Sequence, residues 1–391
     1  MSRLLTLLFG RLPIGWLQLS HNKTRLAAAV AGVAFANLLV FMQLGILGAL
    51  NVATVAPYAL LRSDIMISAE DTHTLTDGSN IARAWMFQAL GVPGVRAAMP
   101  LYVGNLEFKL TDGSSSTLQT FGLDVAQPDF AAPAIAAQLN GLEVENTAIL
   151  DTKARGIPPE AFDGLRAGEP FSFEVNGQTL TAMAGIEVGG GFTADGTLIV
   201  SDQTFLRFFG KRSSGAPNHI LLQVDDGVSV EVVVDRIRAA ISTDSVIVRS
   251  MQAAAAADRT YQTTERPTGI IFGFGVLIGL IVGIVIVYQV LSTDVADHLR
   301  EYATFKAMGY GHRFFLGIVF EEAIVLAFFG FIPGFLVSLG LYAGLRAASG
   351  LPVEMDATRA VVVLIGTLVA CSISGAIATR RLAAADPADL F

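Results

Sequence analysis

Long uncharged runs punctuate this chain, and they are distributed unevenly. No Lys, Arg, Asp or Glu occurs from Leu26 to Ala56 or from Pro267 to Thr293, and two further uncharged runs cover 323–345 and 360–379. A helix of about 20 apolar residues crosses the roughly 30 Å hydrocarbon core of a bilayer. The pattern predicts an α-helical membrane protein with four transmembrane helices in a 1+3 layout, and a large polar insertion between the first and second spans.

The insertion predicts a mixed α/β extracytoplasmic domain. Alternating runs on both sides of Asn176-Gly177 are typical of a type I′ hairpin, and a weaker hairpin signal crosses Asp112-Gly113. Gly189-Gly190-Gly191 indicates a flexible turn. Further strands are expected at 64–68, 148–150, 197–200 and 220–224. Helices are expected at 81–90 and 230–241, and a third is expected to begin near residue 253 and lead into the second span.

The flanks of the spans set the expected orientation. Residues 1–25 carry four basic residues and no acidic one, and Arg380-Arg381 follows the last run, so both termini are expected in the cytoplasm. Large apolar residues around Trp16 favour a segment that lies in the membrane interface. The predicted organisation is an interfacial amphipathic segment at 1–25, spans at 26–50, 268–293, 314–345 and 360–379, the inserted domain at 51–267, a cytoplasmic loop at 294–313, an outer loop at 346–359 and a cytoplasmic tail at 380–391.

Charge and cysteine content exclude several classes of function. The insertion holds 15 basic and 25 acidic residues, a balance that argues against nucleic acid as a partner. The single cysteine, Cys371, lies in the last run, so no intramolecular disulfide can form. The five histidines are not at metal-ligand spacing, and no nucleophile elbow or phosphate loop occurs. We therefore predict no catalytic, cofactor-binding or metal-binding residues in this chain.

Glycines and two carboxylates stand out within the spans. Glu321 and Glu322 lie inside the third run, where charged groups are costly and usually functional; the alternative is that both reach water near the membrane surface. Gly275, Gly279 and Gly283 repeat at helical spacing in the second run. They fit either helix packing within the chain or a dimer seam. Gly330, Gly334 and Gly340 with Pro333 are expected to break the third span and to allow close approach of a neighbouring helix.

The loop between the second and third spans carries the most specific local pattern. Its sequence, "DVADHLREYATFKAMGY" over 294–310, predicts a short helix with one apolar and one charged face, ended by Gly309-Tyr310-Gly311. Such a helix can lie on the membrane or enter a groove of a partner protein. A merely solvated loop helix is the alternative.

This loop, together with the 1+3 layout, resembles the FtsX/MacB-like permeases of ABC transporters. The wording of the loop and "GWLQLSHNKTRLAAAVAGVAFANLLVFMQLG" at 15–45 is most similar to the DevC subfamily, and "GVPGVRAAMPLYVG" at 91–104 and "DPADLF" at 386–391 fit as well. The resemblance covers essentially the whole chain. It implies a non-catalytic subunit of the bacterial inner membrane, with its insertion in the periplasm, that works as a homodimer with a separate cognate ABC ATPase. That ATPase would bind ATP and Mg.

The resemblance also assigns roles. The loop would be a coupling helix that contacts the ATPase through Asp297, His298, Arg300, Glu301, Lys306, Met308 and Gly309. ATP-driven closure would move the spans and reshape the outer domain, a mode called mechanotransmission. DevC-like systems imply a periplasmic membrane-fusion adaptor, a TolC-like outer-membrane channel and export of a lipid, glycolipid or other amphiphile. Two alternatives stay open: an FtsX-like signalling scaffold that activates a cell-wall hydrolase, and a membrane enzyme with its active site in the insertion.

Overall fold

The computed structural model describes residues 14–109, 115–241, 243–298, 301, 304–306 and 308–384. Two compact units make up the chain. The membrane unit comprises Met1–Gly48, Ile270–Gly344 and Val353–Phe391, and the inserted domain comprises Ala49–Gly269 and Leu345–Pro352. The tip of the predicted hairpin at Asp112-Gly113 lies outside the described residues.

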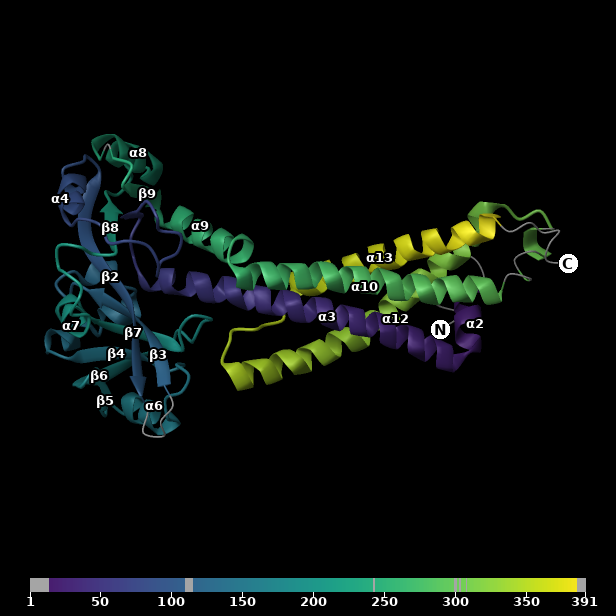
Figure 1. The fold of residues 1–391 in the computed structure, drawn as a ribbon, viewed down its shortest axis with the longest axis horizontal. Coiled ribbons are helices and arrows are strands. Elements are labelled where there is room, and N and C mark those ends of the chain that lie inside the picture. Colours follow the sequence, from purple (N-terminus) through teal and green to yellow (C-terminus); the bar gives the residue numbers. More distant parts are fainter. Residues whose placement is uncertain are drawn as a thin grey trace. The chain divides into compact units, whose positions relative to one another are not determined.

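The membrane unit is built from long apolar helices. Within the described residues, four helices are long and apolar enough to cross a membrane, which confirms the predicted fold class. They run beside one another in Figure 1, and a short helix precedes the first. The helices are α2 (Ile14–His21), α3 (Lys23–Val55), α10 (Pro267–Asp297), α12 (His312–Ser349) and α13 (Ala357–Ala384).

The third span is continuous, and the predicted break is wrong. Helix α12 passes through Pro333 without interruption. Proline removes one backbone hydrogen bond, but neighbouring helices in a membrane bundle can compensate for the loss. The glycines of α12 serve close packing instead: a Cβ on Gly334 would lie 2.8 Å from the carbonyl oxygen of Ala34 in α3, whereas one on Gly340 would meet nothing within 4 Å.

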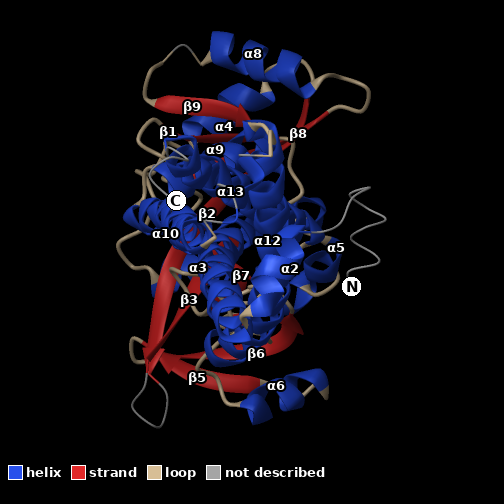
Figure 2. Cartoon of the chain, turned by 90° about the vertical axis from the view of Figure 1, so that its right-hand side faces the viewer, coloured by secondary structure: helices blue, strands red, loops and turns tan. Residues whose placement is uncertain are grey.

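The inserted domain is a nine-stranded mixed sheet, counted over the described residues. Its strand order is β5-β6-β4-β7-β3-β2-β8-β1-β9. Figure 2 shows α4 and α8 at the end of the sheet that holds β8, β1 and β9, and α6 at the end that holds β5. The strands are β1 (Ile65–Ala69), β2 (Val95–Lys109), β3 (Ser115–Leu123), β4 (Thr147–Asp151), β5 (Phe171–Val175), β6 (Gln178–Ile186), β7 (Gly196–Ser201), β8 (His219–Val224) and β9 (Val246–Ser250).

Short helices cover this sheet and connect its strands. The α-helices are α4 (Ala84–Leu90), α5 (Pro133–Ala136), α6 (Pro159–Arg166), α7 (Asp202–Phe208), α8 (Val230–Ala240) and α9 (Met251–Thr264), and the 3-10 helices are η1 (Ala56–Leu60), η2 (Pro128–Phe130) and η3 (Leu139–Glu143). Helix α9 does not run into the second span as expected. It ends at Thr264, and Pro267, whose ring suits a first helical position, begins α10 after two intervening residues.

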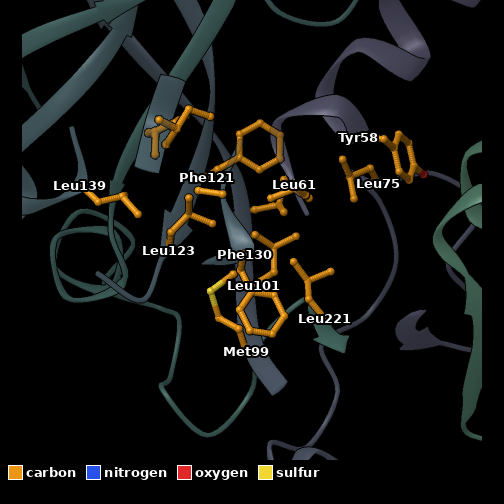
Figure 3. Packing of buried hydrophobic residues seen from close by; sticks show 14 of the residues in the cluster. Tyr58, Leu61, Leu75, Met99, Leu101, Phe121, Leu123, Phe130, Leu139 and Leu221 are labelled. Atoms are coloured by element: carbon orange, nitrogen blue, oxygen red, sulfur yellow. The ribbon is translucent and has the colours of Figure 1, made fainter. Parts of the chain in front are cut away.

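Strand β2 joins the two halves of the sheet. Its first part, from Val95 to Leu101, pairs with β8, and its second part, from Tyr102 to Lys109, pairs with β3. Because both pairings use one continuous strand, neither half can form its complete ladder alone. Side chains from β2, β3, β8 and the η1 region fill one core together, with Tyr58, Phe121 and Phe130 among its largest members (Figure 3).

The predicted type I′ hairpin is present. Strands β5 and β6 pair antiparallel up to Val175 and Gln178, and Asn176 and Gly177 between them have φ values of 51° and 75°. Both residues of a type I′ turn need positive φ, which Asn and Gly adopt at low cost. The pattern thus determined the turn residues as well as the strands.

The glycine-rich turn at 189–191 is held in place, contrary to the expected flexible turn. The buried carboxylate of Asp151 accepts hydrogen bonds from the backbone N–H groups of Val188 at 3.0 Å and Gly189 at 2.8 Å. The Arg155 guanidinium donates to the carbonyls of Gly191, at 2.6 Å, and Ser349, at 2.9 Å. These bonds tie segments far apart in the sequence into one edge of the inserted domain.

Candidate functional site

The loop at 294–313, which the sequence predicts to be a coupling loop, links the end of α10 to the start of α12. Among the predicted contact residues, Glu301, Lys306, Met308 and Gly309 are exposed, and Arg300 lies outside the described residues. Asp297 is the last residue of α10, and its side chain is 59% exposed. The structure therefore presents these five residues at the surface of the membrane unit, as a docking element requires, whereas the His298 side chain is 20% exposed and lies against Asp294.

The end of the coupling helix is fixed by its backbone. Gly309, with φ 93°, donates its N–H to the Lys306 carbonyl, and Tyr310 donates to the Phe305 carbonyl. This pair of bonds is a Schellman motif, in which glycine occupies the left-handed position after the helix. The rings of Phe305, Tyr310 and Phe314 then pack together, with centroids 4.5 Å apart for Tyr310 and Phe314. The loop consequently has a defined exit into α12.

A cluster of carboxylates lies inside the membrane unit close to this loop in sequence. Glu321, Glu322 and Asp294 are 1%, 0% and 2% exposed. The two glutamates therefore do not reach solvent in the structure, which favours the functional interpretation over the surface one. Buried charges are costly unless they are paired or hydrogen-bonded, so the partners of these groups decide what the cluster can do.

Arg25 of α3 supplies the cation that sequence reasoning missed. Its guanidinium hydrogen-bonds Asp297 and lies 3.7 Å from the Asp294 carboxylate. His298 adds a second group next to Asp294, with 3.6 Å between Nδ1 and a carboxylate oxygen. The first span is thus joined to the last turn of α10, the element that leads into the coupling loop.

Glu321 is engaged by α2. Its carboxylate accepts a hydrogen bond from the backbone N–H of Trp16 at 3.2 Å, in the first turn of that helix. The first N–H groups of a helix have no partner inside it and favour an anion. Gly15 permits the contact, because a Cβ there would lie 2.9 Å from the Ile318 carbonyl oxygen and 2.9 Å from Cγ of Glu322. The amphipathic segment therefore packs on α12 through its glycine.

Glu322 is the unusual member of the cluster. Neither of its oxygens makes a hydrogen bond of normal geometry in the described part of the chain, and the ionisable groups that act on it are Asp294, Glu321 and Arg25. A group buried in this way is sensitive to any movement of α10 relative to α12 or α3.

The three repeated glycines of α10 contact α3 of the same chain. A Cβ on Gly275 would collide with the Gln43 side chain, one on Gly279 would lie 3.0 Å from Val40, and one on Gly283 would lie 3.2 Å from Ala36. Small residues allow helix backbones to approach closely in this way. The structure uses this stripe for packing between the first and second spans, and the dimer seam stays a prediction.

No group of three or more potential ligands for a metal ion occurs among the described residues. The sequence gives little sign that Arg25 and Asp294 belong to this site. Arg25 is only one of the basic residues before the first span, and Asp294 is one of several charged residues in a loop whose charges balance. Their pairing follows only once α3 and α10 are known to be neighbours.

The comparisons agree with this architecture. Residues 273–387 match the family model described as FtsX-like permease C-terminal. The membrane unit carries an FtsX-like permease domain. The match includes most of α10, the coupling loop, α12 with its two buried glutamates, and α13. The predicted FtsX-like permease is confirmed for this part of the chain, and the closer likeness to the DevC subfamily stays a prediction.

The solved structures that are similar to this chain align with about half of its residues. One is the periplasmic region of MacB from Actinobacillus actinomycetemcomitans, with 9% identity over 50% of this chain and 92% of that chain and a TM-score of 0.33. Another is the extracellular domain of the noncanonic ABC-type transporter YknZ from Gram-positive bacteria, with 10% identity over 48% of this chain and 98% of that chain and a TM-score of 0.34. These TM-scores are low, and the family assignment rests on the match in the membrane helices. No curated protein matches the sequence.

Proposed function

We propose that this permease subunit couples ATP hydrolysis by a separate ABC ATPase to a shape change of the inserted domain, and so drives export of an amphiphile. The observation that carries the proposal is the family match over 273–387, which contains the exposed coupling loop and the buried carboxylate cluster. ATP and Mg would be bound by the partner. In this arrangement the chain transmits force and performs no chemistry itself.

The route of the signal follows from the contacts of the membrane unit. A push on the coupling loop is applied to the last turn of α10, where Asp294 and Asp297 contact Arg25 of α3. Helices α3 and α10 are also packed along their length through the glycine stripe. Both helices bracket the inserted domain in sequence. Movement of this helix pair as one body would therefore reach both connections of the domain at once.

The cargo class follows from the lining of the spans. Two hydroxyl groups inside the bundle are bonded within it: the Thr367 hydroxyl donates to Asn37 at 2.6 Å, and the Ser374 hydroxyl donates to the Ile284 carbonyl at 2.9 Å. A hydrophilic substrate would need a polar path, which these paired groups do not provide. We therefore favour a lipid, glycolipid or other amphiphile, handed to a periplasmic membrane-fusion adaptor and a TolC-like channel. The proposed orientation places the subunit in the inner membrane, with both termini in the cytoplasm and a homodimer as the working unit.

Purification of the tagged chain from its native host in mild detergent tests the proposal. Recovery of an ABC ATPase together with a membrane-fusion adaptor would support export. Recovery of the ATPase with a cell-wall hydrolase would replace export by an FtsX-like signalling role. Absence of any ATPase under conditions that preserve complexes would overturn the coupling itself.

A charge-reversal variant tests the coupling loop directly. We expect Arg300→Glu combined with Glu301→Arg to abolish stimulation of ATP hydrolysis in the reconstituted complex, because opposite charges would then face the partner. Exchanging exposed Lys23 for Glu, which also alters a charged residue at the end of a span, serves as the control and should leave hydrolysis unchanged. Full activity of the double variant would show that the loop is not the coupling element.

A further inference from the structure

A cavity of about 120 Å³ lies within the inserted domain, apart from the coupling machinery. Five segments line it: the end of α3 with η1, the loop at 74–76, Gln119 of β3, residues 188–197 leading into β7, and the end of α9 with the residues up to 268. The first and last of these segments adjoin the uncharged runs of the first and second spans in sequence. The cavity is therefore built where the chain passes from apolar spans to polar surroundings, the zone of lipid head groups.

Asp258 of α9 is the unusual residue of this cavity. It is 2% exposed, and its Oδ2 accepts hydrogen bonds from the Tyr58 hydroxyl at 3.0 Å and the Leu75 N–H at 2.9 Å. Its other oxygen, Oδ1, makes no hydrogen bond of normal geometry among the described residues, although the Gln262 side chain lies near enough to stabilise the carboxylate. A buried carboxylate oxygen without a donor carries a large desolvation cost. A ligand that donates to Oδ1 would remove that cost.

The other charges near the cavity leave this carboxylate uncompensated. Arg266 is the cation of the lining, and its guanidinium is paired with Asp77 at 3.3 Å. The remaining polar lining consists of neutral groups that can accept hydrogen bonds from a ligand, namely the side chains of Thr74, Thr76, Gln119, Thr197 and Gln262. The described lining thus has a carboxylate without an opposite charge and several hydrogen-bond acceptors, whereas its arginine is already paired. These properties select a positively charged ligand with several N–H donors.

We propose that this cavity binds a primary ammonium group, with Oδ1 of Asp258 as its main acceptor. An ammonium has three N–H donors and no acceptor, which matches the lining. Because two of its lining segments continue directly into the first and second spans in the sequence, an ethanolamine lipid head group is the favoured source, and a soluble polyamine is the other source. Binding is measured without an ATPase, so failure of this proposal leaves the proposed function standing, and the reverse also holds.

Native mass spectrometry of the full chain in detergent tests the proposal. The protein is mixed with phosphatidylethanolamine, phosphatidylcholine and phosphatidylglycerol of identical acyl chains, and bound lipid is counted by mass. We expect phosphatidylethanolamine to be retained about tenfold better than the other two, because only its head group donates N–H hydrogen bonds to a carboxylate. Equal retention of the three lipids would exclude the lipid source, and together with a failure of spermidine to bind it would overturn the proposal.

Variants connect the preference to Asp258. Asp258→Asn keeps an oxygen that can accept from Tyr58 and Leu75 but removes the charge, and it should lower retention of phosphatidylethanolamine to the level of phosphatidylcholine. Asp226→Asn, at a fully exposed carboxylate, is the matched control and should bind as the parent does. Thr76→Trp, at an exposed lining residue, should block the cavity without disturbing the core. Unchanged binding by both Asp258→Asn and Thr76→Trp would refute the site.

Competition separates the two sources of the ammonium group. If spermidine binds to the parent but not to Asp258→Asn, and lipid shows no head-group preference, the site holds and its ligand is a soluble amine. If neither amine distinguishes the parent from Asp258→Asn, the proposal fails.

Discussion

Replacing Asp258 by Asn should make the stability of the inserted domain rise with pH, because it removes one of two buried groups whose titrations oppose each other. Burial raises the pKa of Asp258 from 3.8 to about 6. Burial also lowers the pKa of His219, from 6.5 to about 4. Both groups contact Leu75: its N–H donates to Asp258, and its carbonyl lies 2.9 Å from Nε2 of His219.

The signs follow from proton binding in the folded and unfolded states. The folded protein holds the Asp258 proton more tightly than the unfolded chain, so this group stabilises the fold below pH 4 and loses that contribution as pH rises to about 6. His219 binds its proton more weakly when folded, so its contribution grows as pH rises from about 4 to 6.5. At about 1.4 kcal/mol per pKa unit, each contribution is about 3 kcal/mol. In the parent protein the two nearly cancel.

Denaturant unfolding of the full chain in detergent can measure this effect. The chain has two tryptophans, so Trp16→Phe leaves Trp85 of the inserted domain as the only reporter. The free energy of unfolding of Asp258→Asn minus that of the parent should increase by about 2 kcal/mol between pH 4 and pH 6, because other titrating groups cancel in the difference. His219→Gln should give the opposite slope. Parallel profiles for Asp258→Asn and the parent would refute the assignment of these buried groups.

Two further predictions concern packing and charge in the membrane unit. Gly334→Ala should destabilise the protein by about 1–3 kcal/mol in thermal unfolding, because its Cβ would press on the Ala34 carbonyl. Gly340→Ala on the same helix is the control and should leave the stability unchanged. Equal effects of the two substitutions would contradict the packing of α12 on α3. Arg25→Met should cost about 3 kcal/mol by leaving Asp294 buried without its cation, and adding Asp294→Asn should restore much of the loss. Lys23→Met removes the same charge from an exposed position and should be neutral; a similar loss there would mean that flanking charge, not the pair, matters.

The layout of the chain was readable from the sequence because bilayer thickness imposes a length on apolar runs. The four runs became four helices, and the type I′ turn was visible because positive φ at two consecutive residues nearly requires Asn-Gly. Strand β9 and helices α6 and α7 were missed. Each of these elements is short and only partly apolar, so its sequence pattern resembles that of a loop. Strand β9 is stabilised by pairing with β1, and the two helices are stabilised by packing on the sheet.

The sequence predicted the two buried glutamates of the candidate site but not the residues that contact them. Glu321 and Glu322 stood out because carboxylates are rare in apolar runs, but their partners come from distant parts of the chain. The N–H that binds Glu321 belongs to Trp16, and the cation near Asp294 is Arg25. Nothing in either local sequence marks these residues, since their roles arise from the packing of α2 and α3 on α12 and α10. Asp258 was equally hidden, because its burial depends on loops from three other segments.

The pairing of β1 has a consequence for how the protein is made. Strand β1 leaves the ribosome early, but its neighbours in the sheet are β8 and β9, the last two strands of the inserted domain. From Ala69 until His219 has been synthesised, the apolar residues of β1 have no strand to pair with. Unpaired strand edges of this kind are prone to aggregation, so the nascent chain has a vulnerable interval that ends only when the domain is nearly complete. Truncations before residue 219 should therefore be recognised as misfolded, whereas a chain interrupted after Ser250 has every strand of the sheet.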